Sequence, residues 1–255
     1  MGLITLLTDF GAQDNYVGVM KAVIWAIAPE ATLLDLCHGI PPQDRWAARF
    51  QLLTALPYCP PGAVHLAVVD PGVGSNRRSI AIRCDLGWLV GPDNGIFTGV
   101  LDRYPATAAW SLANPNLWRS PQPSASFQGR DIFAPVAAHL ARGIGPERLG
   151  APLDPATLVR LDLPPLAPTA SGWRGSVQAI DHFGNLISDL PLDLGGNHLV
   201  HQGQTIACRQ CYADAQPGDL LAIPSSHGFW ELAVNQGHAG FRLRAQVGDR
   251  LDLCR

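Results

Sequence analysis

VHLAVVDPGVGSNRR, residues 64 to 78, carries an apolar run into an aspartate, two glycines and two arginines. The segment VHLAVV, residues 64 to 69, is typical of a buried β-strand, and Asp70-Pro-Gly ends it with a turn. A chain that alternates such strands with helices is expected to form a layered α/β domain. The stretch therefore predicts a fold class and also a carboxylate at the end of a strand.

The flanking sequence repeats this unit through residue 150. Further apolar strands are predicted at LITLLT (3–8), TLLDLC (32–37), SIAIRC (79–84) and WLVG (88–91). Helices are predicted from Tyr16 onward, at 46–56 and at 131–143. We therefore expect an N-terminal α/β domain, residues 1–160, with a layered and mostly parallel sheet.

The composition changes after residue 150. Residues 151–172 are rich in proline and poor in periodic apolar positions, which predicts a linker. Beyond it, short alternating segments are broken by Gly, Asn, Asp and Pro, as is typical of a small all-β, barrel-like domain at 172–255.

Charge and hydropathy exclude several classes of protein. The 255 residues are 47% hydrophobic and carry 18 basic and 21 acidic residues, a net charge of −3 without a basic face for nucleic acid. No run of about 18 apolar residues and no cationic leader precedes the first strand, so we expect a soluble, cytoplasmic protein without a membrane partner.

The six cysteines are too sparse for a disulfide scaffold. Cys208 and Cys211 have the spacing of half a zinc site, but no second pair at ligand spacing accompanies them. A zinc protein stays a weak alternative at this point, and no metal is predicted.

Three loops of the first domain place an acid or amide after a strand and before a glycine: TDFG (8–11), VDPGVG (69–74) and GPDNG (91–95). Ligands of open α/β sheets lie outside the carboxyl ends of the strands, so these loops are expected to meet at one crevice. Each loop by itself is equally consistent with a simple turn.

Asp70 and Arg77 suggest a particular chemistry. Neither dinucleotide nor P-loop glycine spacing is present, and an aspartate would repel phosphate. A guanidinium nearby favours the ionised carboxylate, which can orient and polarise a water molecule. The alternative is a solvated ion pair. In SFQGRDIFAP (126–135), Gln128, Arg130 and Asp131 lie at the start of a helix, and Arg130 with Asp131 is more consistent with a local structural pair.

Seven ordered motifs carry a family resemblance: LLTDFG, DNYVGVMKAVI, DLCHGIPPQD, VVDPGVGSNRR, GPDNG, FQGRDIFAPVAAHLA and AIDHFGN. Together they resemble the S-adenosylmethionine hydroxide adenosyltransferases, relatives of the fluorinase and chlorinase enzymes, over residues 3 to 240. The resemblance implies hydrolysis of S-adenosylmethionine to adenosine and methionine, with S-adenosylmethionine as substrate and no cofactor. It also implies a homotrimer that binds substrate between the N-terminal domain of one subunit and the C-terminal domain of its neighbour.

The resemblance further assigns site residues. Asp9 is implied to hold the ribose hydroxyls, Asn185 to contact the adenine edge and Tyr212 its face. Asp181 is implied to bind the methionine ammonium and Ser226, beside His227, its carboxylate. The remaining members of the implied set are Phe183 for substrate and Asp70, Arg77 and Gln128 for water activation.

Gln128 departs from the family, which usually has histidine there. Glutamine can hydrogen-bond a water but cannot take its proton, so a base role falls on Asp70 or solvent. A non-catalytic or very slow trimer that binds S-adenosylmethionine or adenosine is therefore a second hypothesis. A halogenase is disfavoured, because fluorinase has Tyr and Thr where this chain has Asp70 and Val73, and a carboxylate repels halide.

Overall fold

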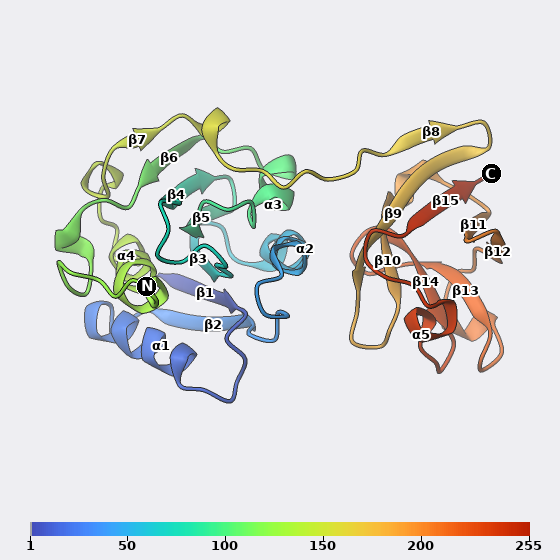
Figure 1. Ribbon diagram of the computed structural model, residues 1–255, viewed down its shortest axis with the longest axis horizontal. Coiled ribbons are helices and arrows are strands. Elements are labelled where there is room, and N and C mark those ends of the chain that lie inside the picture. The colour runs from blue at the N-terminus through green and yellow to red at the C-terminus, as the bar shows by residue number, and fades with distance from the viewer. Residues whose placement is uncertain (1) are drawn as a thin grey trace. The chain divides into compact units, whose positions relative to one another are not determined.

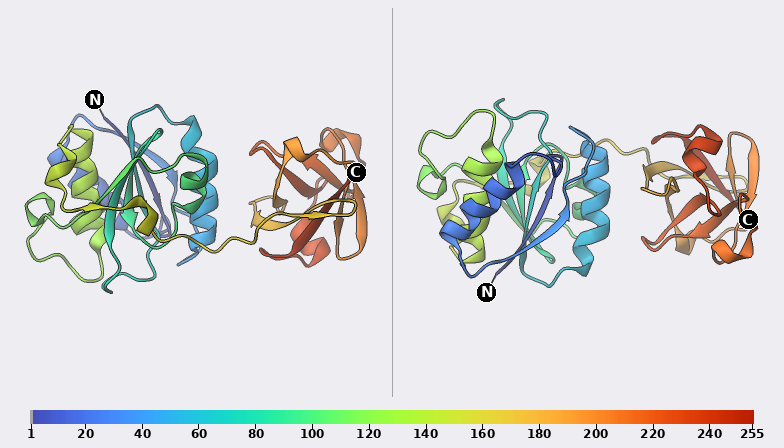
Figure 2. Two further views of the ribbon diagram at one scale, coloured as in Figure 1. Left: turned by 90° about the horizontal axis from the view of Figure 1, so that it is seen from above. Right: turned by 90° about the horizontal axis from the view of Figure 1, so that it is seen from below.

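The computed structural model describes residues 2–255, which form two compact units that divide between Leu161 and Asp162 (Figure 1). The first unit is a seven-stranded sheet in the order β2-β1-β3-β5-β4-β6-β7 with helices on both faces (Figure 2). Its strands are β1 (Leu3–Thr8), β2 (Thr32–Cys37), β3 (Ala63–Val68), β4 (Ser79–Cys84), β5 (Gly87–Pro92), β6 (Ala108–Ser111) and β7 (Pro152–Leu153).

The α/β expectation is confirmed, and the sheet is mixed. β2, β1, β3 and β5 are parallel, whereas β4 pairs antiparallel with both β5 and β6, and β7 pairs antiparallel with β6. β4 and β5 are joined by a tight turn, which forces the antiparallel pairing because parallel neighbours need a crossover of a dozen residues or more.

Helices cover the two faces through separate apolar clusters. One face carries α1 (Tyr16–Ile27) and α4 (Ala134–Ala141), and the other carries α2 (Arg45–Ala55) and α3 (Thr98–Arg103). Met20 and Ile24 form the buried stripe of α1, as the helical spacing predicts. Asp44 caps α2 by accepting from the backbone N–H groups of Trp46 and Ala47 at 3.0 and 2.9 Å, which stabilises the helix by about 1 kcal/mol.

The order of the central strands positions the functional loops. The chain moves from β1 to β2 on one side and to β3 on the other, so the sheet has a topological switch point between β1 and β3. Thr8 and Val68 are partners in the β1–β3 register. The loops that begin at Asp9 and at Val69 therefore start side by side, where open α/β sheets bind ligands.

The second unit is an antiparallel sheet that nearly closes on itself, as expected for a barrel-like domain. Its strands are β8 (Ala167–Thr169), β9 (Gly172–Ile180), β10 (Leu186–Pro191), β11 (His198–His201), β12 (Gln204–Ala207), β13 (Leu220–Pro224), β14 (Phe229–Val234) and β15 (Arg250–Cys254). A bridge between Cys208 and Ala222 links the end of β12 to β13 and draws the sheet edges together. A short helix, α5 (Ala239–Leu243), follows β14.

The proline-rich segment 151–172 contributes short strands to both units. β7 extends the first sheet, and β8 pairs with β9 of the second. No helix within residues 2–255 has both the length and the apolar character needed to cross a membrane.

Candidate active site

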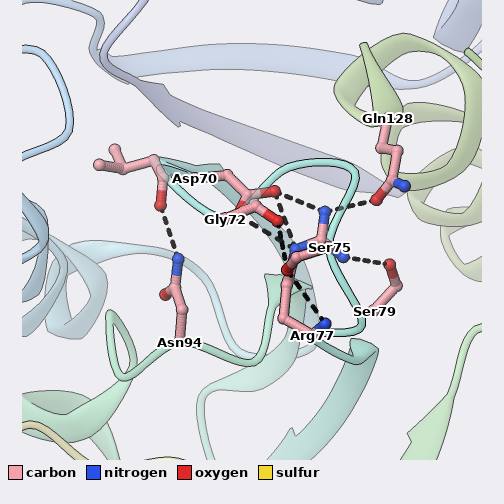
Figure 3. A network of polar contacts seen from close by, with 8 residues as sticks. Asp70, Gly72, Ser75, Arg77, Ser79, Asn94 and Gln128 are labelled. Carbon is pink, nitrogen blue, oxygen red and sulfur yellow. Dashed lines mark hydrogen bonds and ion pairs between the residues drawn. The ribbon is translucent and has the colours of Figure 1, made fainter. Parts of the chain in front are cut away.

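Asp70 and Arg77 form a closely held ion pair in the loop after β3 (Figure 3). Arg77 Nε donates to both carboxylate oxygens of Asp70, at 3.1 and 3.0 Å, and Arg77 Nη2 donates to Oδ2 at 2.5 Å. The side chains are only 5% exposed for Asp70 and 11% for Arg77. The pair is therefore mostly removed from solvent, unlike the solvated surface pair that was the alternative.

The guanidinium of Arg77 also reaches beyond its own loop. Its Nη2 donates to Gln128 Oε1, its Nη1 donates to Ser79 Oγ at 2.8 Å, and it lies 5.3 Å from the centre of the Phe133 ring. Since Arg77 can only donate, the carbonyl oxygen of Gln128 must face it, and the Gln128 amide nitrogen points away, as Figure 3 shows. Asp70, Arg77 and Gln128 are thus brought into one network.

Local sequence explains the shape of this loop. The Val73 and Ser75 N–H groups donate to the carbonyls of Asp70 and Gly72, and Ser75 Oγ donates to Gly72 O at 2.7 Å. Gly74 has φ +81°, and a Cβ there would lie 2.9 Å from the carbonyl oxygen of Ala125. Glycine therefore permits both the left-handed turn and the close approach to the segment that leads to Gln128.

The GPDNG loop (91–95) makes structural contacts with the VDPGVG loop (69–74) and its neighbours. Asn94 Nδ2 donates to the carbonyl of Val69 at 2.9 Å. Asp93 accepts from Arg78 Nε at 2.7 Å and from the Val159 N–H at 2.9 Å. The expectation that all three loops open onto one crevice holds for the loops of Asp9 and Asp70; in the GPDNG loop the polar side chains make structural contacts.

A cavity of about 380 Å³ opens beside this network in the first unit. Its wall contains the predicted residues Asp9, Asp70 and Gln128, together with Val73. Asp9 Oδ2 accepts from the backbone N–H of Gln43 at 2.7 Å, which leaves Oδ1 for a ligand. Arg77 does not line this cavity but contacts Asp70, which does.

Aromatic side chains also line this cavity. Phe10, Tyr16 and Phe127 lie with ring centres 5.2 to 5.9 Å apart, in tilted and edge-on arrangements. Only motif membership linked these three residues at the level of sequence, since no spacing rule brings Phe127 to Phe10.

Arg130 and Asp131 form the structural pair that the sequence favoured. Asp131 accepts from Arg130 Nε and Nη2 at 2.7 Å each and from the backbone N–H of Ser124 at 2.8 Å. The hydrogen bond from Arg130 lowers the pKa of the Asp131 carboxyl. The helix begins earlier than the predicted residue 131, because a π-helical turn, η3 (Gly129–Phe133), precedes α4. The buried Asp131 anchors the loop that ends at Gln128.

A second cavity, of about 620 Å³, lies in the second unit. Phe183, Asn185 and Tyr212 line it together with residues 234–238. Asn185 Nδ2 donates to Asp181 Oδ2 and to the Tyr212 hydroxyl, both at 2.9 Å. Three of the predicted substrate-binding side chains therefore share one hollow, and Asp181 contacts one of them.

Glu231 belongs to this group and was not found by sequence reasoning. It accepts from the Tyr212 hydroxyl at 2.8 Å and is buried in β14. Burial raises the pKa of the Glu231 carboxyl, and burial together with Glu231 raises the pKa of the Tyr212 hydroxyl. An isolated glutamate in FWELAV carries no sequence signal, because its role depends on a contact with Tyr212, which lies 19 residues away in the sequence.

Ser226 and His227 lie elsewhere in the second unit. They occupy the turn between β13 and β14, beside the β10 end at Pro191, whereas Asn185 precedes the other end of β10. Neither residue lines the cavity of Asn185 and Tyr212.

The cysteine pair gains no further metal ligand from the fold. Burial raises the pKa of the Cys208 thiol to about 11, while Cys211 is exposed. Residues 2–255 contain no cluster of three or more His, Cys, Asp or Glu side chains suited to a metal ion.

Comparisons with known proteins extend over both units. Residues 4–150 match the family model for the SAM hydroxide adenosyltransferase N-terminal domain, and residues 175–252 match the model for its C-terminal domain. The chain is 36% identical to an uncharacterized conserved protein from Thermotoga maritima, whose crystal structure superposes with a TM-score of 0.93 over 99% of this chain and 100% of that one.

Curated relatives cover nearly the whole chain. Proteins named (R)-S-adenosyl-L-methionine hydrolase are 43% identical in Thermus thermophilus, over 95% of both chains, and 40% identical in Salinispora arenicola, over 97% of this chain and 96% of the relative. A fluorinase from Actinopolyspora mzabensis is 24% identical over 96% of this chain and 95% of its own length. With both halves matched and curated relatives well above 30% identity, the chain belongs to the S-adenosylmethionine hydroxide adenosyltransferase family.

Proposed function

We propose that the protein is an enzyme that hydrolyses S-adenosyl-L-methionine to adenosine and L-methionine. The observation that carries the proposal is the buried Asp70–Arg77 pair, with Asp70 in a cavity wall, in a chain of this family. Its relatives named (R)-S-adenosyl-L-methionine hydrolase match it over nearly the full length and give further support.

The proposed reaction is an in-line displacement at the ribose 5′ carbon. A water oxygen forms the new bond to carbon while the carbon–sulfur bond breaks, and its electron pair stays on sulfur as a neutral thioether. Asp70 accepts a hydrogen bond from the water and then its proton, which passes to solvent. Because the positive charge of the sulfonium disperses, the leaving group needs no acid and a partly dehydrated site favours the reaction.

Gln128 has a defined part in this reaction. Its carbonyl faces Arg77, so its amide N–H groups are free to donate to a lone pair of the water. A water that donates to Asp70 and accepts from Gln128 is fixed in orientation, and alignment alone contributes several kcal/mol to catalysis. Glutamine thus orients the water without serving as a base.

The proposed substrate contacts use residues of the two cavities. We assign Asp9 to the ribose hydroxyls, which can donate to its free oxygen, Asn185 to the adenine edge, and Tyr212 and Phe183 to the apolar faces of the nucleoside. Asp181, Ser226 and His227 are assigned to the methionine part through the family resemblance.

We also propose a cytoplasmic homotrimer in which each substrate is bound by the first unit of one subunit and the second unit of a neighbour, without a resident cofactor. A carboxylate at position 70 disfavours halide as the nucleophile, which separates this reaction from that of the fluorinase relatives.

The test is to incubate the purified chain with S-adenosylmethionine and to follow adenosine by chromatography. Adenosine should accumulate with the wild type and fall to background with Asp70→Ala. Equal production by both proteins would contradict the assignment of Asp70, and no adenosine from the wild type would contradict the function.

A further inference from the structure

A chain of hydrogen bonds runs through the wall of the second cavity. Asn185 Nδ2 donates to Asp181 Oδ2 and to the Tyr212 hydroxyl oxygen. The Tyr212 hydroxyl then donates to Glu231 Oε1. Asn185 and Glu231 are 5% and 7% exposed, so solvent has little access to these contacts.

The two acids at the ends of this series of hydrogen bonds, Asp181 and Glu231, determine which groups donate and which accept. A carboxylate only accepts, so Asp181 requires the amide N–H₂ of Asn185 on its side, and it also accepts the Asn185 backbone N–H at 2.8 Å. Glu231 accepts a hydrogen bond from the Tyr212 hydroxyl, which leaves the phenol oxygen to accept from Asn185. A protonated Glu231 would still offer a carbonyl oxygen to the tyrosine.

Asn185 is therefore left with one free polar group. Both protons of its side-chain amide are committed to Asp181 and Tyr212. Its carbonyl oxygen Oδ1 has no hydrogen-bond partner within residues 2–255, and the residue lines the cavity. Toward a ligand, Asn185 acts as an acceptor only.

We infer that Glu231 and the Tyr212 hydroxyl are positioning groups that hold the Asn185 carbonyl toward the base and so select a 6-amino purine over a 6-oxo purine. The inference rests on the proposed function, because it takes a nucleoside base as the occupant of this cavity. The amino group of adenine donates to Asn185 Oδ1. Hypoxanthine would place an oxygen there, so two acceptors would face each other and a buried hydrogen bond would be lost.

The experiment compares binding of adenosine and inosine to the full chain by titration calorimetry, because these probes share the ribose and differ at the 6 position. The wild type is expected to prefer adenosine by about 100-fold. Tyr212→Phe keeps the aromatic ring and removes the hydroxyl, so this preference should fall by about tenfold. Tyr58→Phe, at a residue 82% exposed in the first unit, is the matched control and should leave the preference unchanged.

A second variant tests the direction of these hydrogen bonds. Asp181→Asn combined with Glu231→Gln preserves side-chain shape but replaces both acceptor-only ends with amides that can donate. Asn185 can then turn its N–H₂ toward the base, and the affinity for inosine should rise by about tenfold. General structural damage would lower both affinities and would not produce this gain.

The outcomes separate the two levels of the proposal. The positioning role is supported if Tyr212→Phe lowers the ratio of adenosine affinity to inosine affinity and the double variant binds inosine more tightly than the wild type. Equal wild-type affinity for the two nucleosides, or a preference unchanged in both variants, overturns that role and leaves the hydrolase standing. A wild type that forms adenosine from S-adenosylmethionine but does not bind added adenosine overturns this inference alone, whereas a wild type that neither forms nor binds adenosine overturns the proposed function as well.

Discussion

Arg77→Lys is the most informative single change in the proposed active site. Lysine keeps the positive charge but has no planar fork, so it cannot hold both oxygens of Asp70 and also reach Gln128. At least one hydrogen bond involving a charged group is lost, which is worth about 1.5–3 kcal/mol. If that loss falls wholly on the transition state, kcat decreases by about 10- to 150-fold.

The structure also predicts where the effect should appear. Arg77 lies outside the cavity wall and touches the proposed water only through Asp70 and Gln128. We therefore expect KM for S-adenosylmethionine to change by less than about twofold, since an interaction felt only in the transition state lowers kcat alone.

The assay is steady-state adenosine formation, with thermal unfolding to verify the fold of each variant. Arg78→Lys is the matched control, because Arg78 pairs with Asp93 and Thr157 in a structural contact. Its kcat should stay within about twofold of the wild type. An Arg77→Lys enzyme with normal kcat, or with a raised KM and unchanged kcat, would refute the positioning role.

Three further outcomes are expected. Burial lowers the pKa of His65 from 6.5 to about 4, so the unfolded chain takes up a proton before the folded chain does as pH falls. The contribution of His65 to the free energy of unfolding is fully present above about pH 6.5, and about 3 kcal/mol is lost by pH 4. Denaturant unfolding of the wild type and of His65→Gln at both pH values measures this loss. Gly184→Ala should cost at least about 2 kcal/mol more than Gly203→Ala in thermal unfolding, because both glycines have positive φ (+85° and +80°), but only at 184 would a Cβ meet a neighbour, the His238 ring, at 2.2 Å. Gln128→His should raise kcat at least about tenfold above about pH 6.5, where imidazole can accept a proton. Equal kcat in the two proteins would mean that Asp70 alone accepts the proton of the water. A variant that gains activity over an inert wild type would favour the binding-protein hypothesis.

Much of the fold could be predicted from local pattern. The strand runs at 3–8, 32–37 and 79–84 are observed as β1, β2 and β4, and the second predicted helix differs by one residue at each end. Helix α3 was missed because Thr98–Arg103 is too short for helical periodicity to emerge. The reversed direction of β4 was also missed, since strand direction depends on the length of the connection and on sheet order.

In the candidate site, too, contacts within one loop could be predicted from the sequence, whereas contacts between distant segments could not. Asp70 and Arg77 are seven residues apart in one loop, so their pairing could be predicted from proximity in the chain. The contact of Arg77 with Gln128 spans 51 residues and depends on how the loop held by Asp131 packs beside Gly74. No spacing rule predicts such a contact, because it is set by the packing of helices on the sheet.

The sequence by itself determined which chemical groups stand at the strand ends, because turns and apolar runs are local properties of the chain. Only the tertiary structure decided which of these groups meet: β1 and β3 as neighbours bring Asp9 beside Asp70, while the fold of the second unit brings Tyr212 to the buried Glu231 of β14. Contacts of this kind follow from strand order and pairing register, which many distant residues fix together, so they cannot be inferred from any single segment.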